Sequence, residues 1–320
     1  MIITLKNGKT FVAKPTQSLL DAAQAAGLPL EYSCKTGRCG ICRAPRPVGV
    51  TRILQPESAP EATEQTILTC CRAAEESLFL DLEDLGELAK YEPKTLPCRI
   101  VSIERLSEDT VEVWLRTPPT GKLDYLPGQY INVIGPGGVR RAYSVANAPR
   151  ADGQLSLLIR RVKNGQMSAY WFDKAKAGDL LRLNGPLGTF HLRRNRAKEL
   201  IFLATGTGIA PIRGFLGATL PASWNPKIRV YWGNRTEQDI VWDDTRFIPV
   251  LSRADAEWSG RRGYVQAALT DDGFDAGTST VYACGSPTMI RDAHRLLMTA
   301  GLPTENFHSD AFVSSESANR

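Results

Sequence analysis

The sequence predicts a multidomain protein that combines a small α+β domain, an antiparallel β-barrel and a doubly wound parallel α/β domain, in this order along 320 residues. Three observations support this prediction. Five of the seven cysteines lie within the first 71 residues, residues 98–192 read as strand after strand, and strands alternate with helices from Glu199 onward. We therefore place domains at residues 1–85, 97–195 and 196–320, with a polar, proline-containing linker at 86–96.

The first domain begins with two short strands around an Asn-Gly turn, followed by a helix whose N-cap is expected to be Ser18. A glycine and a proline end this helix, and an apolar run near residue 80 predicts a closing strand. The expected elements are strands at Ile2–Leu5 and Thr10–Ala13, a helix from Leu19 to about Ala26, and a strand at Leu78–Leu82.

Between that helix and the closing strand, Cys34, Cys39 and Cys42 follow a C-x4-C-x2-C spacing, and Cys70 and Cys71 come much later. Thiolates repel one another unless a cation lies between them, and three ligands on one loop with a distant fourth is the spacing of a plant-type [2Fe–2S] cluster. The alternatives are a zinc site or a disulfide pair. Zinc sites favour two short cysteine pairs, so the spacing favours iron and sulfur.

The composition is that of an ordinary soluble protein, with 42% hydrophobic and 23% charged residues. No apolar run is long enough to cross a bilayer, and the N-terminus lacks the regions of a signal peptide. The net charge of +5 is scattered rather than gathered in one tract. We therefore expect a cytoplasmic monomer that binds neither membranes nor nucleic acid.

The middle domain reads as an antiparallel barrel interrupted by one helix. Turns and Gly/Pro pairs separate its strands, and the interrupting helix is expected at about 166–176. The strands are expected at 98–105, 110–116, 129–134, 141–146, 154–162 and 179–183.

The last domain reads as a parallel doubly wound sheet. Its strands are expected at 199–204, 227–232, 247–251 and 280–283, with helices at 210–219, 262–269 and 286–299. The first strand runs into Thr205-Gly206-Thr207-Gly208, whose glycines allow a backbone to approach a pyrophosphate. The third glycine of G-x-G-x-x-G is absent, so this loop alone leaves nucleotide binding and a plain strand–helix turn as equal alternatives.

Several motifs at matching spacing resemble one family. Arg141-Ala142-Tyr143-Ser144 resembles the R-x-Y-S flavin motif of the ferredoxin–NADP reductase superfamily, and Gly206–Pro211 matches its G-x-G-x-A-P loop. Cys284–Met289 matches its Cys-Gly-x-Pro-x-Met motif on the nicotinamide side, and the first domain resembles the β-grasp ferredoxins. The chain is similar to the NAD(P)H-dependent reductases of Rieske dioxygenases and di-iron monooxygenases, and more similar to the reductases that serve CDP-6-deoxy-4-hexulose-3-dehydrase.

The resemblance implies an enzyme that passes electrons from NADH, rather than NADPH, to FAD, then to the [2Fe–2S] cluster and to a partner enzyme. That partner would be a deoxysugar dehydrase or a Rieske or di-iron oxygenase. It implies Cys70 rather than Cys71 as the fourth ligand, because Leu-Thr-Cys is where plant-type ferredoxins place theirs. The implied metal ligands are Cys34, Cys39, Cys42 and Cys70.

The resemblance also implies roles near the flavin and the nicotinamide. Ser144 would reach flavin N5, Cys284 would lie near the hydride path, and Phe312 would lay its ring near the flavin. The other residues expected to bind cofactor are Arg141, Ala142, Tyr143, Ile159, Arg160, Gly165, Met167, Ser168, Gly206, Thr207, Gly208, Pro211, Asn234, Arg235 and Gly285. For Phe307, two alternatives stay open and are equally favoured. Its ring lies near the flavin, or it is a buried residue of a final edge strand.

Two features depart from the family pattern. Only about ten residues separate Asp239 from the next strand, where the family has a full helix, and Pro45 and Pro47 predict a short strand after the cluster loop. The missing helix supports an alternative function, in which the protein is not an enzyme but a redox-sensing or interaction module with a degenerate nucleotide domain. Two carboxylates, Glu237 and Asp239, follow Arg235, and they favour NADH because they would repel a 2′-phosphate.

Overall fold

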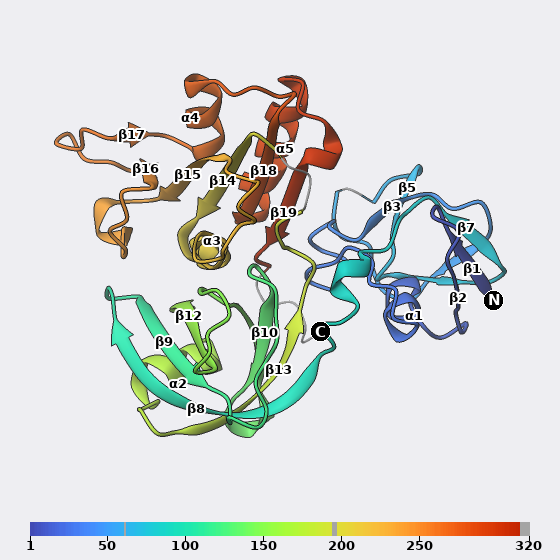
Figure 1. Cartoon of the computed structure of the whole chain (residues 1–320), viewed down its shortest axis with the longest axis horizontal. Coiled ribbons are helices and arrows are strands. Elements are labelled where there is room, and N and C mark those ends of the chain that lie inside the picture. The colour runs from blue at the N-terminus through green and yellow to red at the C-terminus, as the bar shows by residue number, and fades with distance from the viewer. Residues whose placement is uncertain (61, 194–196, 314–320) are drawn as a thin grey trace. The chain divides into compact units, whose positions relative to one another are not determined.

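The computed structural model describes residues 1–60, 62–193 and 197–313 of the chain (Figure 1). These residues form two compact units. The first contains Met1–Glu92 together with residues 310–313, and the second contains the described residues of Pro93–Ser309.

The first unit is built on a small mixed sheet. Its central strand β1 (Ile2–Leu5) pairs antiparallel with β2 (Thr10–Val12) and parallel with β7 (Leu78–Leu80). Helix α1 (Leu19–Ala25) is capped as expected, because the Ser18 hydroxyl accepts a hydrogen bond from the backbone N–H of Asp21 at 3.0 Å. Two further strand pairs complete the unit: β3 (Arg43–Pro45) with β5 (Thr66–Leu68), and β4 (Thr51–Ile53) with β6 (Arg72–Ala74).

The barrel is a sheet of six antiparallel strands in the order β11-β10-β13-β8-β9-β12. An isolated bridge between Val145 and Leu157 nearly closes it. Helix α2 (Gln166–Asp173) follows β12, and its Met167 and Trp171 belong to the barrel core. The strands are β8 (Lys94–Arg105), β9 (Thr110–Arg116), β10 (Tyr130–Ile134), β11 (Arg140–Ser144), β12 (Gln154–Arg160) and β13 (Leu180–Leu187).

Strand β8 begins inside the segment that the sequence suggests as a linker. Lys94 pairs with Gly185 on β13, so residues 94–96 are already part of the barrel. Before them, only a single turn of 3-10 helix, η1 (Gly86–Leu88), interrupts the expected linker. The extension depends on β13, which lies about ninety residues further along the chain, and local sequence carries no signal of it.

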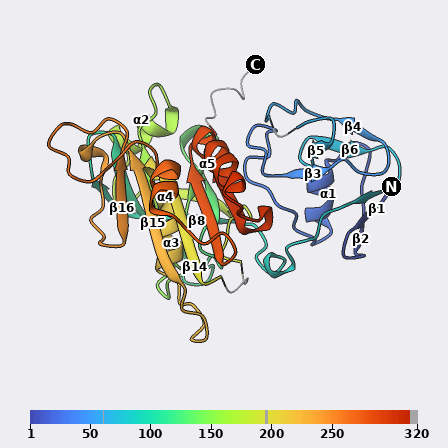
Figure 2. The same ribbon diagram turned by 90° about the horizontal axis from the view of Figure 1, so that it is seen from above.

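The last part of the second unit is a sheet in the order β17-β16-β15-β14-β18-β19, in which β14 to β18 run parallel (Figure 1). Helices α4 and α5 lie side by side on one face, and α3 covers the other (Figure 2). The strands are β14 (Glu199–Thr205), β15 (Lys227–Asn234), β16 (Phe247–Leu251), β17 (Arg261–Arg262), β18 (Ser279–Gly285) and β19 (Phe307–Ala311); the helices are α3 (Ile209–Leu216), α4 (Val265–Asp272) and α5 (Pro287–Thr299).

Three helix boundaries differ by three residues from those expected. The helix expected at about 166–176 ends at Asp173. The helix expected at 262–269 begins at Val265, because Arg261–Arg262 pair with β16 as the short strand β17. The helix expected at 210–219 ends at Leu216, with Gly217 as its C-cap. None of the helices in the described ranges is long and apolar enough to cross a membrane.

An aromatic core joins the end of the barrel to the parallel sheet. The Phe190 ring, just after β13, packs against Phe215 on α3 at 5.2 Å and against Tyr282 on β18 at 5.9 Å between ring centroids. A second link is polar, since Glu112 on β9 is buried and accepts a hydrogen bond from Arg213 on α3 at 2.7 Å. The end of the barrel therefore packs on the parallel sheet within the second unit, while the barrel interior forms a core of its own.

Candidate functional site

The cysteine loop depends on Gly37. This residue has φ of +70°, and a Cβ placed on it would lie 2.3 Å from the Pro56 carbonyl oxygen and 2.7 Å from the Cys71 sulfur. Its own carbonyl accepts hydrogen bonds from the backbone N–H groups of Ser58 and Ala59. Only glycine fits this position, because any side chain would collide with fixed backbone.

The cysteines approach one another in two pairs. The Sγ atoms of Cys42 and Cys70 are 3.2 Å apart, and Cys34 shares a hydrogen bond with Cys39. These bonds are the main reason that the pKa values of Cys34 and Cys70 are lowered and that those of Cys39 and Cys42 are raised.

The paired arrangement fits a cluster of two irons. No group of three or more His, Cys, Asp or Glu side chains among the described residues is arranged to hold a single metal ion. Two thiol pairs suit a [2Fe–2S] cluster, in which four cysteines share two irons. Backbone N–H groups add to the fit, since that of Thr36 donates to the Cys34 sulfur at 3.3 Å.

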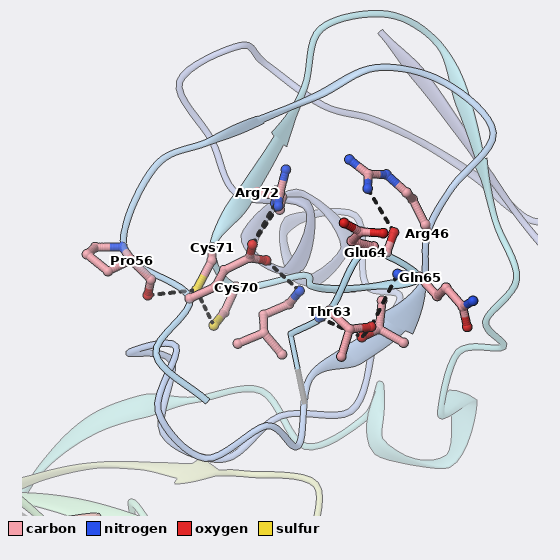
Figure 3. Close-up of polar contacts among 11 residues, drawn as sticks. Arg46, Pro56, Thr63, Glu64, Gln65, Cys70, Cys71 and Arg72 are labelled. Carbon is pink, nitrogen blue, oxygen red and sulfur yellow. Dashed lines mark hydrogen bonds and ion pairs between the residues drawn. The ribbon is translucent and has the colours of Figure 1, made fainter. Parts of the chain in front are cut away.

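The side chain of Cys71 points to a different partner (Figure 3). Its sulfur is buried, faces the Pro56 carbonyl oxygen at 3.7 Å and lies 3.5 Å from the Cys70 sulfur. Cys70, by contrast, faces Cys42. This geometry supports Cys70 as the fourth ligand, and the assignment stays a prediction until iron is measured.

Glu57 holds the turn that carries Cys70, a role that the sequence did not reveal. Its carboxylate accepts hydrogen bonds from the backbone N–H of Leu68 at 2.8 Å and from the Arg72 guanidinium at 2.6 Å. Both partners flank the cysteine turn, and the Glu57–Arg72 pair is mostly buried. In the sequence, Glu57 is one of three glutamates within eight residues, and nothing distinguishes it from a solvated charge.

A buried carboxyl lies beside the cysteine loop within the same unit. Asp310 accepts a hydrogen bond from the hydroxyl of Ser33, the neighbour of Cys34, at 2.5 Å. Burial raises the pKa of Asp310 to about 6, despite this hydrogen bond.

The proposed flavin motif lies on β11. Ser144 is buried, and the hydroxyl of half-buried Tyr143 accepts a hydrogen bond from Trp171 Nε1 on α2 at 2.9 Å. Burial raises the pKa of Tyr143 to about 12, so its hydroxyl is neutral at physiological pH. Trp171 thus fixes the Tyr143 ring, which is expected to contact the flavin. The sequence does not reveal this role, because a tryptophan in a helix is usually a core residue. Ala142 is exposed, and Arg141 Nη1 donates to the Arg140 carbonyl oxygen at 2.7 Å.

The first turn of α2 lies close to β12. Gly165 is its N-cap and has no side chain to occupy the free backbone N–H groups, which suits a phosphate. The Ser168 hydroxyl is used locally, because it accepts a hydrogen bond from the backbone N–H of Val162 at 2.8 Å. The side chains of Met167 and Ile159 lie in the barrel core, so any contact of Ile159 with a cofactor would come from its backbone.

The glycine loop after β14 is pressed against the end of β18. A Cβ on Gly208 would lie 2.3 Å from the Cys284 carbonyl oxygen, and the backbone N–H of Ser286 donates to Thr205 Oγ1 at 2.9 Å. Gly206 has φ of +52°, and a Cβ placed on it would lie 3.7 Å from Arg160 Nη1. Cys284 is fully buried, and Pro211 is buried in the first turn of α3. The loop therefore offers a cradle at the carboxyl edge of the sheet, where dinucleotides bind in such folds.

The segment after β15 contains no full helix, as the sequence indicates. The single 3-10 turn η4 (Glu237–Asp239) is followed by irregular chain to β16. In place of a helix, Trp242 packs near Trp232 with 6.4 Å between ring centroids and lies under the Arg213 guanidinium at 4.2 Å. The shortened segment is therefore anchored by apolar contacts.

The predicted adenosine-side residues differ in exposure. Asn234 ends β15 and is buried, and its Nδ2 has no hydrogen-bond partner among the described residues, while Arg235 is exposed. Near the end of the chain, Phe307 is buried with its ring against His294. This fits the alternative in which Phe307 is a buried residue of an edge strand. Phe312 follows β19 and is 36% exposed, so its ring is available to a ligand.

Models of three families match successive parts of the chain. The 2Fe-2S iron-sulfur cluster binding domain matches residues 3–75, the oxidoreductase FAD-binding domain residues 97–192, and the oxidoreductase NAD-binding domain residues 202–295. Protein RfbI of Salmonella typhimurium is 39% identical over 95% of this chain and 94% of its own length. The CDP-6-deoxy-L-threo-D-glycero-4-hexulose-3-dehydrase reductase of Yersinia pestis is 37% identical over 97% of both chains.

The chain belongs to the family of these dehydrase reductases. This reductase is also similar to the toluate 1,2-dioxygenase electron transfer component of Pseudomonas putida, at 28% identity over 95% of this chain and 94% of that protein. Among solved structures, Amycolatopsis cytochrome P450 reductase GcoB has a TM-score of 0.76 at 25% identity, covering 98% of this chain and 99% of its own. The reductase is thus an NAD(P)H-dependent oxidoreductase with [2Fe–2S], FAD and pyridine-nucleotide domains and an electron-accepting partner.

Proposed function

We propose that this reductase takes a hydride from NADH, passes the electrons through FAD to a [2Fe–2S] cluster on Cys34, Cys39, Cys42 and Cys70, and delivers them to a deoxysugar dehydrase. Flavin supplies the conversion between two-electron hydride transfer and one-electron transfer to iron. The dehydrase is preferred over an oxygenase as partner, because the dehydrase reductase is 37% identical and the dioxygenase component 28%.

The observation that carries this proposal is the close packing of α3 on the end of the flavin-motif strand. A Cβ on Gly214 of α3 would lie 3.2 Å from the carbonyl oxygen of Val145, the residue after Ser144. Helix α3, which begins at the glycine loop, therefore packs on the end of the strand that carries Tyr143 and Ser144. A nicotinamide and a flavin held by these two elements would meet at short range.

The chain's own residues would act by binding and orientation. Arg141 supplies a guanidinium for the flavin pyrophosphate, and the Tyr143 ring, fixed by Trp171, supplies a packing surface for the flavin ring. The buried Ser144 hydroxyl supplies a hydrogen bond near the atom that receives the hydride. Packing of Trp242 in the shortened segment argues against a degenerate nucleotide domain.

We infer FAD rather than FMN, because the uncapped N-terminus of α2 offers a site for a second phosphate. We infer NADH over NADPH, although Asp239 is paired with Arg160, so that Glu237 is the carboxylate left to oppose a 2′-phosphate. The positive charge of Arg235 would attract a 2′-phosphate and so partly offset its repulsion by Glu237. We therefore expect a preference of about fivefold in kcat/KM, or about 1 kcal/mol.

An anaerobic titration of the purified reductase with NADH tests this function. The expected result is bleaching of the flavin bands and then reduction of the iron–sulfur cluster, with FAD as the flavin found by mass spectrometry. Addition of the oxidised dehydrase should then reoxidise the protein. Absence of bleaching would reject the reductase function, FMN would reject the flavin assignment, and an NADPH kcat/KM at or above that of NADH would reject the nucleotide preference.

A further inference from the structure

Glu112 on β9 is a buried carboxylate that links the barrel to helix α3. Its side chain is 7% exposed, and its Oε1 accepts hydrogen bonds from Arg213 Nη1 on α3 at 2.7 Å and from the Ser156 hydroxyl on β12 at 2.5 Å. A carboxylate removed from water needs such partners, because it is otherwise strongly destabilised. The position of Glu112 therefore determines where the Arg213 guanidinium lies.

On the barrel side, this link continues to the residues that follow the flavin motif. The backbone N–H of Ser156 donates to Asn147 Oδ1 at 2.6 Å, and its carbonyl oxygen accepts from the backbone N–H of Ala146 at 2.8 Å. Ala146 and Asn147 come two and three residues after Ser144, the last residue of the motif. Ser156 thus joins Glu112 directly to the end of the flavin-motif strand.

On its other side, Arg213 contacts the segment that takes the place of the helix expected after β15. Its Cζ lies 4.2 Å from the centroid of the Trp242 ring, a cation–π contact. Trp242 packs near Trp232, whose Nε1 donates to the Gly206 carbonyl oxygen at 2.8 Å. Arg213 is therefore connected to the glycine loop through two tryptophans.

Helix α3 also packs closely on the same part of the barrel. A Cβ on Gly214, the residue after Arg213, would lie 3.2 Å from the Val145 carbonyl oxygen and 3.4 Å from the Asn147 carbonyl oxygen. This close contact sets a distance between the helix and the barrel, but it leaves rotation of the helix about the contact free. The neighbouring ion pair between Arg213 and Glu112 restricts that rotation.

We propose that Glu112, Arg213 and Trp242 are positioning residues for hydride transfer, which set the placement of the glycine loop, and so of a nicotinamide bound there, relative to the flavin-motif strand. The inference rests on the proposed function. A displacement of about 1 Å between reacting groups lowers a rate about 100-fold. A shift of about a third of that distance would therefore slow the transfer about fivefold.

The alternative is that the three residues only stabilise the fold. The Arg213 side chain is 37% exposed, so solvent screens its pair with Glu112 and limits what the pair adds to stability. Removal of Arg213 alone would still destabilise the protein, because Glu112 would stay buried without its cation. Neutralising Glu112 in the same variant removes this penalty without restoring the link. Stability and rate therefore respond differently in the double variant.

The test compares Arg213→Met, Glu112→Gln and the double variant with the wild type, all as full-length, FAD-loaded protein. Stopped flow gives the limiting rate of flavin bleaching by NADH and the NADH concentration at half-saturation, and urea unfolding gives the stability. We expect Arg213→Met to be less stable and to bleach about fivefold to tenfold more slowly, with half-saturation changed by less than about twofold. The double variant should regain stability but not rate. Trp242→Leu, which keeps the ion pair, should also bleach more slowly.

Arg150 offers a matched control. Like Arg213, it pairs with a carboxylate, that of Asp152 at 2.8 Å, and lies over a tryptophan ring, that of Trp114 with 5.6 Å from its Cζ to the centroid. All three of these residues belong to the barrel, so they do not connect it to the glycine loop. Arg150→Met should keep the wild-type limiting rate, half-saturation and FAD content.

The outcomes separate this proposal from the proposed function. Wild-type protein whose flavin NADH does not bleach would reject the function itself. If the wild type bleaches, a double variant with the wild-type limiting rate would overturn the positioning role, and so would a double variant that loses FAD or stays as unstable as Arg213→Met. Equal slowing in Arg150→Met would overturn it as well, and a wild-type rate in Trp242→Leu would remove Trp242 from it. A slow double variant with wild-type stability and FAD content supports the proposal.

Discussion

His308 on β19 is a half-buried base that the native protein keeps uncharged. Its ring packs against Tyr282 with 5.0 Å between centroids, and its Nε2 is buried without a hydrogen-bond partner among the described residues. Burial, together with the positive charge of Arg193 and the nearby His191, lowers the pKa of His308 to about 3. The unfolded chain has the ordinary histidine value of 6.5.

This difference makes stability depend on pH in a defined direction. Above pH 6.5 both states are neutral at His308, and its contribution to stability is fully present. As the pH falls toward 3, the unfolded chain takes up a proton that the native chain refuses, and stability is lost by about 1.4 kcal/mol per pH unit. Between pH 7 and pH 5 the loss from this one group is about 2 kcal/mol.

The test compares the wild type with His308→Asn in urea unfolding at pH 7 and pH 5. All six tryptophans lie between Trp114 and Trp258, so their fluorescence reports the second unit alone. His308→Asn loses the ring contact with Tyr282 at both pH values. This loss cancels when the free energies of unfolding of the same protein at pH 7 and pH 5 are subtracted. We expect the pH-induced loss to be smaller in the variant by about 2 kcal/mol. Equal losses in both proteins would show that native His308 takes up its proton freely.

Two further predictions concern the cluster loop and the nucleotide loop. Cys71→Ser should keep about two iron atoms per chain, and Cys70→Ser should lose most of them; the reverse result would assign the ligand to Cys71. Gly208→Ala forces a Cβ to within 2.3 Å of the Cys284 carbonyl oxygen, so the two loops must separate. We expect flavin reduction by NADH to slow by about tenfold or more with FAD retained, and an unchanged rate in stopped flow would contradict this account of the loop.

Much of the fold follows from local signals. The spacing of Cys34, Cys39 and Cys42 and the N-cap at Ser18 are short-range patterns, and β1, β9 and β16 have the predicted bounds. Such features succeed because turn chemistry, capping and strand periodicity act over a few residues. The short strand β3 was likewise predicted, since proline limits strand pairing.

The sequence alone could establish the motifs, but only the tertiary structure decided which partners their side chains meet. Arg160 and Asp239 are 79 residues apart, and Glu112 and Arg213 are 101 apart. Cys70 and Cys71 are adjacent in sequence, yet one faces Cys42 and the other Pro56. The physical reason is that an ion pair or a thiol contact depends on distances of a few ångströms between segments whose meeting is set by the packing of the whole core, which no local pattern records.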